Sequence, residues 1–85
     1  EIKAKSIGME IDVRGENAEE AILRVERFID ESLLLGSPFI RIIHGKGTGV
    51  LKTKIHEMLR NHPNIKGYNF APYNQGGDGA TEIKL

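Results

Sequence analysis

Residues 39–51 read FIRIIHGKGTGVL, and this stretch decides the fold. Its first five residues are apolar or β-branched apart from Arg41, which is typical of a buried strand covered by helices. A glycine-rich segment, residues 44–49, follows the strand. Beyond it, apolar residues recur at helical spacing and predict a helix that ends near Asn61-His62-Pro63; they are Leu51, Ile55, Met58 and Leu59. A strand, a glycine-rich loop and a helix in this order predict an α/β unit whose strand is central in the sheet.

On the N-terminal side, Met9 to Arg14 alternates apolar and charged residues, which predicts a strand ended by Gly15 with Asp12 and Arg14 on one face. Asn17 is suited to cap the helix that follows. This helix is expected to run to Leu35, with Gly36 in the left-handed position after it. Its apolar residues recur at helical spacing; they are Ala18, Ala21, Ile22, Val25, Phe28 and Ile29.

On the C-terminal side, residues 65–70 predict a third strand and residues 80–85 a closing one, separated by an irregular loop rich in turn residues. The order is therefore β-α-β-α-β-β. Right-handed crossovers through two helices make the first three strands parallel, and the last returns antiparallel. The predicted fold class is α/β, a two-layer sandwich of one mixed four-stranded sheet and two helices.

The composition sets limits on function. A chain of 85 residues supports one domain, and the absence of cysteine excludes disulfides, thiolate catalysis and cysteine zinc sites. No apolar stretch approaches the ~20 residues that span a bilayer, so we expect no membrane association and a cytoplasmic protein. The sequence begins with glutamate, and residues 1–8 are expected to be a linker from a longer parent protein, with the domain at residues 9–85.

The net charge of zero conceals an uneven distribution. Residues 10–31 carry eight acids and three bases, whereas residues 32–77 carry six bases and one acid. The second part is therefore suited to a phosphate-rich partner. A solvated surface of mixed charge is the alternative interpretation.

The loop at residues 44–49 is the strongest candidate binding site. Ligands of open α/β sheets bind beyond the carboxyl ends of the parallel strands. Three glycines in six residues let backbone N–H groups approach a phosphate at the start of a helix, and Lys46, Lys52 and Lys54 supply charge. The loop matches neither G-x-x-x-x-G-K-[ST] nor G-x-G-x-x-G, so we expect no nucleotide cofactor. Alternatively, the glycines serve only a tight turn with Thr48 as a helix cap.

Few side chains are suited to acid–base chemistry. His44, at the end of a buried strand, is either a general acid or base or a hydrogen-bonded turn residue. Asp12 is the best-placed carboxylate, but a simple pair with Arg14 explains it equally. Glu16 and Asp78 are second carboxylates only if their loops fold inward. His56 and His62 lack the spacing of a helical metal site, and both are predicted to lie at the surface.

Several motifs together resemble the small MutS-related (Smr) domain over residues 9–85. They are Ile11-Asp12-Val13-Arg14-Gly15, the helix containing Glu19-Glu20-Ala21, His44-Gly45-Lys46-Gly47-Thr48-Gly49-Val50-Leu51, and Gly76-Gly77-Asp78-Gly79-Ala80-Thr81. The Asp-x-Arg form of the first motif is most similar to the domain that ends proteins of the second bacterial MutS paralogue family. Many Smr domains have histidine where this chain has Arg14, which cannot act as a base at neutral pH.

The resemblance implies a fold like the C-terminal domain of bacterial translation initiation factor three. It also implies binding and nicking of DNA, branched or structured DNA included, or of RNA, within a homodimeric MutS-related ATPase of DNA recombination or repair. Carried over by position, the first family motif falls on Asp12 and Arg14, and the second on His44, Gly45, Lys46, Gly47 and Gly49.

The expected catalytic residues are Asp12, Arg14 and His44. The expected nucleic-acid-binding residues are Arg14, Gly45, Lys46, Gly47, Thr48, Gly49, Lys52 and Lys54. A divalent cation such as Mg²⁺ is the expected cofactor, with Asp12 as its candidate ligand. The alternative function is a non-catalytic module that docks its parent onto nucleic acid or a ribosome.

Overall fold

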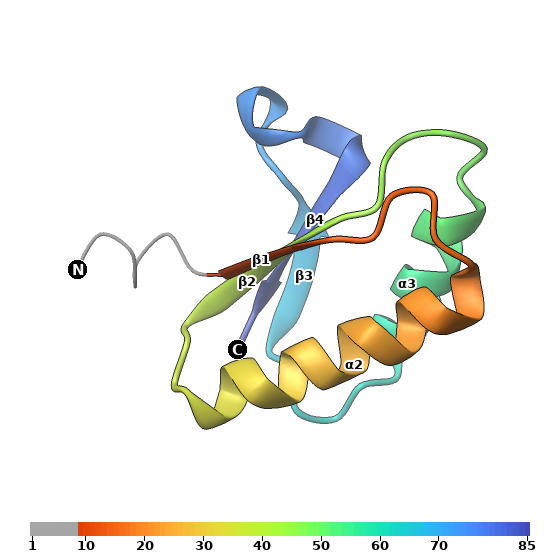
Figure 1. Cartoon of the computed structure of the whole chain (residues 1–85). Coiled ribbons are helices and arrows are strands. Elements are labelled where there is room, and N and C mark those ends of the chain that lie inside the picture. The colour runs from red at the N-terminus through yellow and green to blue at the C-terminus, as the bar shows by residue number, and fades with distance from the viewer. Residues whose placement is uncertain (1–8) are drawn as a thin grey trace.

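The computed structural model describes residues 9–85, and the predicted linker at residues 1–8 lies outside this range. The elements in chain order are β1 (Met9–Asp12), α2 (Ala18–Leu34), β2 (Phe39–Ile43), α3 (Val50–Arg60), β3 (Gly67–Phe70), the short 3-10 turns η1 (Tyr73–Gln75) and η2 (Gly77–Gly79), and β4 (Ala80–Lys84). This is the predicted β-α-β-α-β-β order (Figure 1). No helix in the described range is long and apolar enough to cross a membrane.

Helix α2 begins and ends where its sequence signals predict. The Asn17 side chain accepts hydrogen bonds from the backbone N–H groups of Glu19 and Glu20, at 2.9 and 3.3 Å. These two acids lie in the first turn, where the helix dipole favours negative charge. At the other end, Gly36 has a φ of +74°, which L side chains rarely adopt and which stops the helix.

The strand order of the sheet is β1-β2-β4-β3. Strands β1 and β2 pair in parallel, and β4 pairs antiparallel with both β2 and β3, so the first three strands point the same way. The prediction of strand directions and of a central β2 is confirmed. The register places Asp12 beside Ile43, and Ile43 beside Ala80. The ends of β1 and β2 therefore meet the start of β4 at one edge of the sheet.

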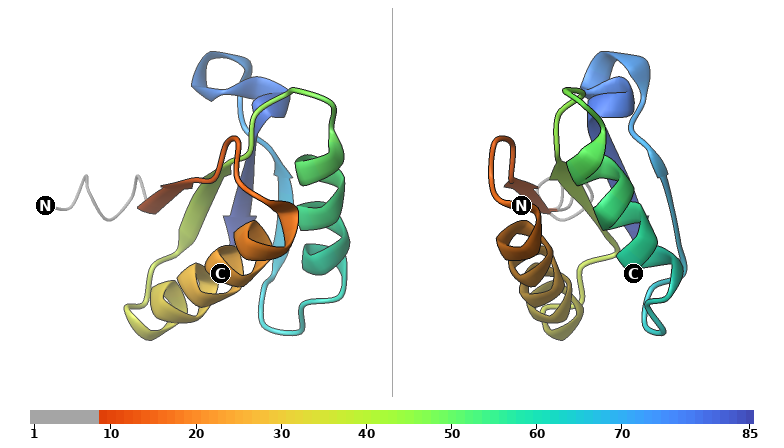
Figure 2. Two further views of the ribbon diagram at one scale, coloured as in Figure 1. Left: turned by 45° about the vertical axis from the view of Figure 1, so that its right-hand side comes forward. Right: turned by 90° about the vertical axis from the view of Figure 1, so that its right-hand side faces the viewer.

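Both helices cover the same face of the sheet, which gives the predicted two layers (Figure 2). The core between the layers is aliphatic; its fully buried residues are Val13, Ala21, Val25, Ile29, Ile40, Ile42, Ile55, Leu59 and Ile83. Since Ile40 and Ile42 point into this core, the alternation of side chains along β2 turns Arg41 to the opposite face.

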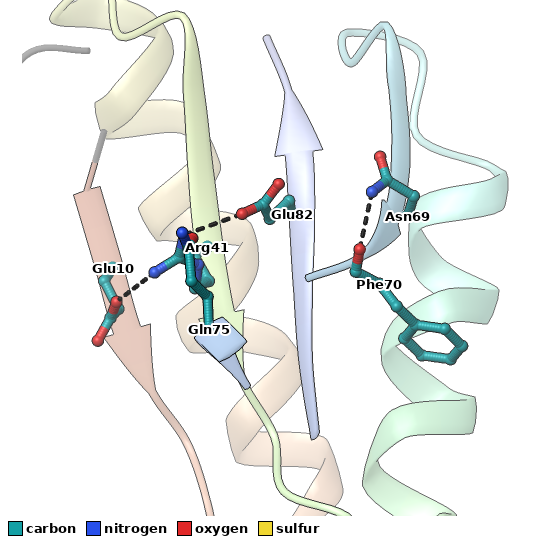
Figure 3. Close-up of polar contacts among 6 residues, drawn as sticks. All are labelled: Glu10, Arg41, Asn69, Phe70, Gln75 and Glu82. Atoms are coloured by element: carbon teal, nitrogen blue, oxygen red, sulfur yellow. Dashed lines mark hydrogen bonds and ion pairs between the residues drawn. The ribbon is translucent and has the colours of Figure 1, made fainter. Parts of the chain in front are cut away.

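Arg41 organises the polar face of the sheet. Its guanidinium lies between Glu10 of β1, at 3.3 Å, and Glu82 of β4, at 2.9 Å (Figure 3). It also donates to the side chain of Gln75 in η1. Its side chain is only 16% exposed. Arg41 thus ties the β3–β4 connection back onto the sheet, which fixes the loop that borders the edge described above.

Three strands are shorter than predicted, β4 by one residue because it ends at Lys84, and β1 and β3 by two residues each. Strand β1 ends at Asp12, although the N–H of Val13 still donates to the carbonyl of Ile43 at 2.9 Å. Its one partner among residues 9–85 is β2, which ends at Ile43, so Arg14 has no strand residue of this range opposite it. Strand β3 begins at Gly67, two residues later than predicted.

Candidate nucleic-acid interface

The candidate site is the rim where β1 and β2 end and β4 begins. The carbonyl oxygen of Gly79 accepts hydrogen bonds from the backbone N–H groups of both His44 and Gly45, at 3.1 and 2.8 Å. This pair of bonds joins the end of the β3–β4 connection to the glycine loop. The segment from Asp12 to Gly15, the glycine loop at residues 44–49 and the end of the β3–β4 connection at Gly79 therefore meet at one rim.

Asp12 and Arg14 form a forked ion pair at this rim. The carboxylate oxygen Oδ1 accepts from the backbone N–H and Nε of Arg14, both at 3.0 Å, and Oδ2 accepts from Nη2 at 2.6 Å. Hydrogen bonds from Arg14 lower the pKa of Asp12 to about 2. Both side chains are largely exposed. Asp12 is therefore ionised and held in place, as the simple-pair interpretation predicted.

Two glycines allow the cationic side chains of the rim to lie flat against the backbone. Gly45 has a φ of +82°, and a Cβ atom there would lie 3.2 Å from Cγ of Arg14. At Gly79, a Cβ atom would lie 3.3 Å from Cγ of Lys46. The aliphatic stems of Arg14 and Lys46 thus pack over glycines, and their charged ends project from the same rim.

The glycine loop encloses a hollow of about 310 Å³ lined on its far sides by Glu16 and Lys52. Lys46 also approaches Asp78 of η2, at 3.4 Å, with both side chains exposed. Lys54 lies elsewhere, in a second shallow hollow that it shares with Thr48 and Gly49. The structure therefore brings Arg14, Lys46 and Lys52 around one loop and sets Lys54 to its side.

The alternative interpretation, in which Thr48 caps α3, was wrong, because the N-cap residue is Gly49. Gly49 occupies the N-cap position with a φ of +85°, and it makes no side-chain cap bond. Thr48 precedes it, and its hydroxyl accepts from the N–H of Val50 at 3.4 Å. The glycines of the loop thus supply a left-handed backbone, which frees Thr48 from the cap position.

His44 is buried, with 4% of its area exposed. Its Nδ1 lies 2.9 Å from the carbonyl oxygen of Gly45, and its Nε2 lies 2.7 Å from Oγ1 of Thr81. A carbonyl only accepts, so Nδ1 carries the proton and neutral His44 accepts at Nε2 from the Thr81 hydroxyl. Burial lowers the pKa of His44. Its role in proton transfer stays a prediction, since both ring nitrogens are occupied within the protein.

The prediction that His56 lies at the surface was wrong. His56 is half-buried, and its Nε2 lies 2.7 Å from the same Thr81 hydroxyl. Its ring packs against Tyr68 and Phe70, with centroids 5.2 and 5.3 Å away. Helical spacing places His56 at the border of the apolar stripe of α3, where sequence alone does not decide between core and solvent. His62 lies beyond α3, and its Nδ1 accepts from the N–H of Asn64.

Each carboxylate of the rim lies beside a cationic side chain of the protein. Glu16 pairs with Arg24, and Asp78 lies beside Lys46. Both oxygens of Asp12 are engaged by Arg14. Within residues 9–85, no three histidine, cysteine, aspartate or glutamate side chains group to hold an ion. Magnesium is usually held by one or two carboxylates together with waters and substrate phosphates, so the divalent cation, with Asp12 as its candidate ligand, stays a prediction.

Comparisons with known proteins identify the family of the chain. The family model described as the Smr domain matches residues 11–85. Endonuclease MutS2 of Enterococcus faecalis is 49% identical over 98% of the chain, and that of Carboxydothermus hydrogenoformans is 51% identical over 98%. The chain spans only 10 to 11% of the length of these two relatives.

Solved structures give the same assignment. The Smr domain of Thermus thermophilus MutS2 superposes with a TM-score of 0.89 at 39% identity, covering 91% of this chain and 96% of that one. YdaL, a stand-alone small MutS-related protein from Escherichia coli, shares the fold with a TM-score of 0.84 at 24% identity, over 95% of this chain and 64% of that one. The chain belongs to the Smr domain family.

Proposed function

We propose that this domain binds the backbone of nucleic acid at the rim and nicks it. One observation carries the proposal: Arg14 and Lys46 pack over Gly45 and Gly79 and project two cations beside a glycine loop. The relatives are named endonucleases, which supports the same chemistry for this chain. Since the chain spans about a tenth of those relatives, we also propose that it works within a larger, homodimeric MutS-related protein of the cytoplasm.

Phosphate binding follows from the groups present. The fork of Arg14 gives Nε and Nη2 to Asp12, so Nη1 can donate to a phosphate oxygen. Lys46 supplies a second positive charge and Lys52 a third, from the first turn of α3. The dipole of α3 adds partial positive charge at the same loop. None of these groups reads a base, so the grip is independent of sequence.

Hydrolysis requires water to attack phosphorus, with one P–O bond broken to leave a phosphate monoester and a hydroxyl. Negative charge develops on the non-bridging oxygens, next to Arg14 and Lys46, and preorganised cations stabilise it. A carboxylate with a pKa of about 2 is a weak base. Asp12 therefore orients Arg14, and protons exchange with solvent at this exposed rim. His44 positions Gly45 from below.

A second function, docking without chemistry, is favoured by a specific observation. Both oxygens of Asp12 are engaged by Arg14, and both ring nitrogens of His44 are hydrogen-bonded inside the protein. A module that only binds DNA, RNA or a ribosome needs neither a free base nor a metal. Such a module uses the same cations, so its binding is also salt-dependent.

Nicking of supercoiled plasmid by the 85-residue chain decides between the two. We expect the wild type to convert plasmid to the open circle, Asp12→Ala to bind but not cut, and Arg14→Lys to cut poorly, since lysine keeps the charge but not the fork. A parallel reaction with chelator reports any need for a divalent cation. Equal nicking by the wild type and Asp12→Ala would assign the activity to a contaminant. If the wild type and both variants bind nucleic acid and none of them nicks it, the docking function is established.

A further inference from the structure

A third hollow is lined by residues of α3 and by Phe70 of β3. It measures about 300 Å³, and its lining includes Lys52, His56, Arg60 and Phe70. Phe70 comes from β3, which is an edge strand, and 44% of its area is exposed (Figure 3). An exposed phenylalanine beside two cations is not explained by the core.

The Phe70 ring is fixed in place. The ring of His56 packs against it at a centroid distance of 5.3 Å and an angle of 36°. Nζ of Lys52 lies 5.4 Å from the ring centroid, within the range of a cation–π contact. Thr81, opposite Phe70 in the sheet register, binds His56 in turn. The aromatic surface is therefore preorganised.

This hollow shares the lining residue Lys52 with the hollow of the glycine loop. Lys52 and Arg60 give the Phe70 hollow two positive charges against the single carboxylate of Glu57. A nucleic-acid strand whose phosphates are bound at the glycine loop would therefore reach the Phe70 ring beside Lys52.

We propose that Phe70 is a stacking platform for an unpaired nucleobase of the bound strand. The proposal rests on the function proposed above and specifies its substrate. Aromatic side chains stack on any base whose face is open, whereas the faces of bases within a duplex are covered by their neighbours. The domain therefore prefers nucleic acid with a single-stranded segment, such as a gap, a loop or a branch, over continuous duplex.

The chain contains no tryptophan, which makes a direct test available. In Phe70→Trp, the only tryptophan reports on the hollow, and single-stranded oligonucleotide should quench its fluorescence. Leu34→Trp is the matched control, because Leu34 is 87% exposed at the far end of α2 and should show no quenching. Equal quenching at both positions, or none at position 70, overturns the stacking platform.

Affinity gives the second measurement. Stacking of one base is worth roughly 1–3 kcal/mol, so Phe70→Ala should bind gapped DNA about 5- to 150-fold more weakly and continuous duplex as well as the wild type does. Phe70→Tyr should retain both affinities, and thermal melts check that each variant folds. An equal loss on both substrates overturns the platform but leaves the nucleic-acid function intact. Absence of binding to either substrate by the wild type overturns both proposals.

Discussion

His44 and His56 hydrogen-bond to the same atom, Oγ1 of Thr81, each at a distance of 2.7 Å. The hydroxyl has one proton, which it donates to His44, so His56 must donate its own Nε2 proton to the hydroxyl oxygen. Burial lowers the pKa of both rings. The arrangement is complete when both imidazoles are neutral. A proton added to Nε2 of His44 turns this nitrogen into a donor, so the Thr81 hydroxyl can no longer donate to it.

Stability should therefore depend on pH near neutrality. Above the ordinary imidazole pKa of about 6.5, the free energy of unfolding should be constant. As the pH falls below this value toward the lowered pKa values of the folded state, the unfolded chain binds protons that the folded chain does not, and stability declines. Urea titrations between pH 8 and pH 5 measure this decline.

A substitution tests whether the loss of stability at low pH comes from His44 and His56. His56→Gln keeps an N–H donor for Thr81 but removes a titrating ring, so the decline should become shallower. Free energies of unfolding that stay flat from pH 8 to pH 5 in the wild type would contradict the arrangement.

Thr81→Val should destabilise the fold although it keeps the shape of the side chain. The valine leaves buried His44 without its donor and His56 without its acceptor, at a cost of about 1–3 kcal/mol for an unsatisfied buried group. Thr81→Ser keeps the hydroxyl and loses one methyl group, about 1 kcal/mol. Chemical denaturation ranks the two variants. Valine as stable as the wild type would show that the hydroxyl contributes nothing.

His44→Ala separates bracing from proton transfer. Because the ring is buried and bonded at both nitrogens, we expect nucleic-acid binding, nicking and the thermal midpoint to fall together. If His44 transfers a proton, its loss instead lowers the nicking rate by roughly 10²- to 10⁴-fold with little change in binding or midpoint. Single-turnover nicking, fluorescence anisotropy and melting curves on one preparation give the three readouts.

Gly45→Ala tests the packing of Arg14. The left-handed backbone costs an alanine roughly 1–2 kcal/mol, and the new methyl group also meets Cγ of Arg14. Gly36→Ala is the matched control, since Gly36 has a φ of +74° and nothing within 4 Å of a Cβ atom. Both variants should lose similar stability in denaturation, and only Gly45→Ala should lose nucleic-acid affinity. Equal affinities would place Arg14 outside the interface.

Lys46→Ala should weaken binding to all sequences alike and reduce the slope of log affinity against log salt by about one unit. Lys66→Ala removes a lysine outside the rim, next to a different hollow, and should change neither quantity. Asp12→Asn should bind as tightly as the wild type or more so, because a carboxylate repels the phosphate backbone. Anisotropy titrations at several salt concentrations provide these values, and identical slopes for the two lysine variants would move the interface elsewhere.

The fold was predictable from sequence because its signals are local and agree with each other. The alternation from Met9, the Asn17 cap and the run from Phe39 to Ile43 each specify one element, and right-handed crossovers then specify the strand directions. The position of β4 between β2 and β3 was not predictable, since it depends on which neighbour its edge pairs with.

The site was only partly predictable, because some of its contacts are local motifs and others join segments that are far apart in the sequence. The glycine loop and Asp12 with Arg14 are local motifs, and the structure places them together as predicted. The His44–Thr81–His56 contact joins residues 25 to 37 positions apart, and no single segment indicates it. Gly79 resembled a turn residue, although its carbonyl joins two loops and its missing side chain makes room for Lys46.

The interior position of β4 governs when the domain can mature on the ribosome. Strand β3 pairs only with β4, and the Gly79 carbonyl and the Thr81 hydroxyl come from the same late stretch of chain. A nascent polypeptide that has emerged as far as Phe70 contains both helices but has an unpaired strand and an unbraced glycine loop. Emergence of β4 supplies the pairing partner of β3 together with the Gly79 and Thr81 contacts of the rim.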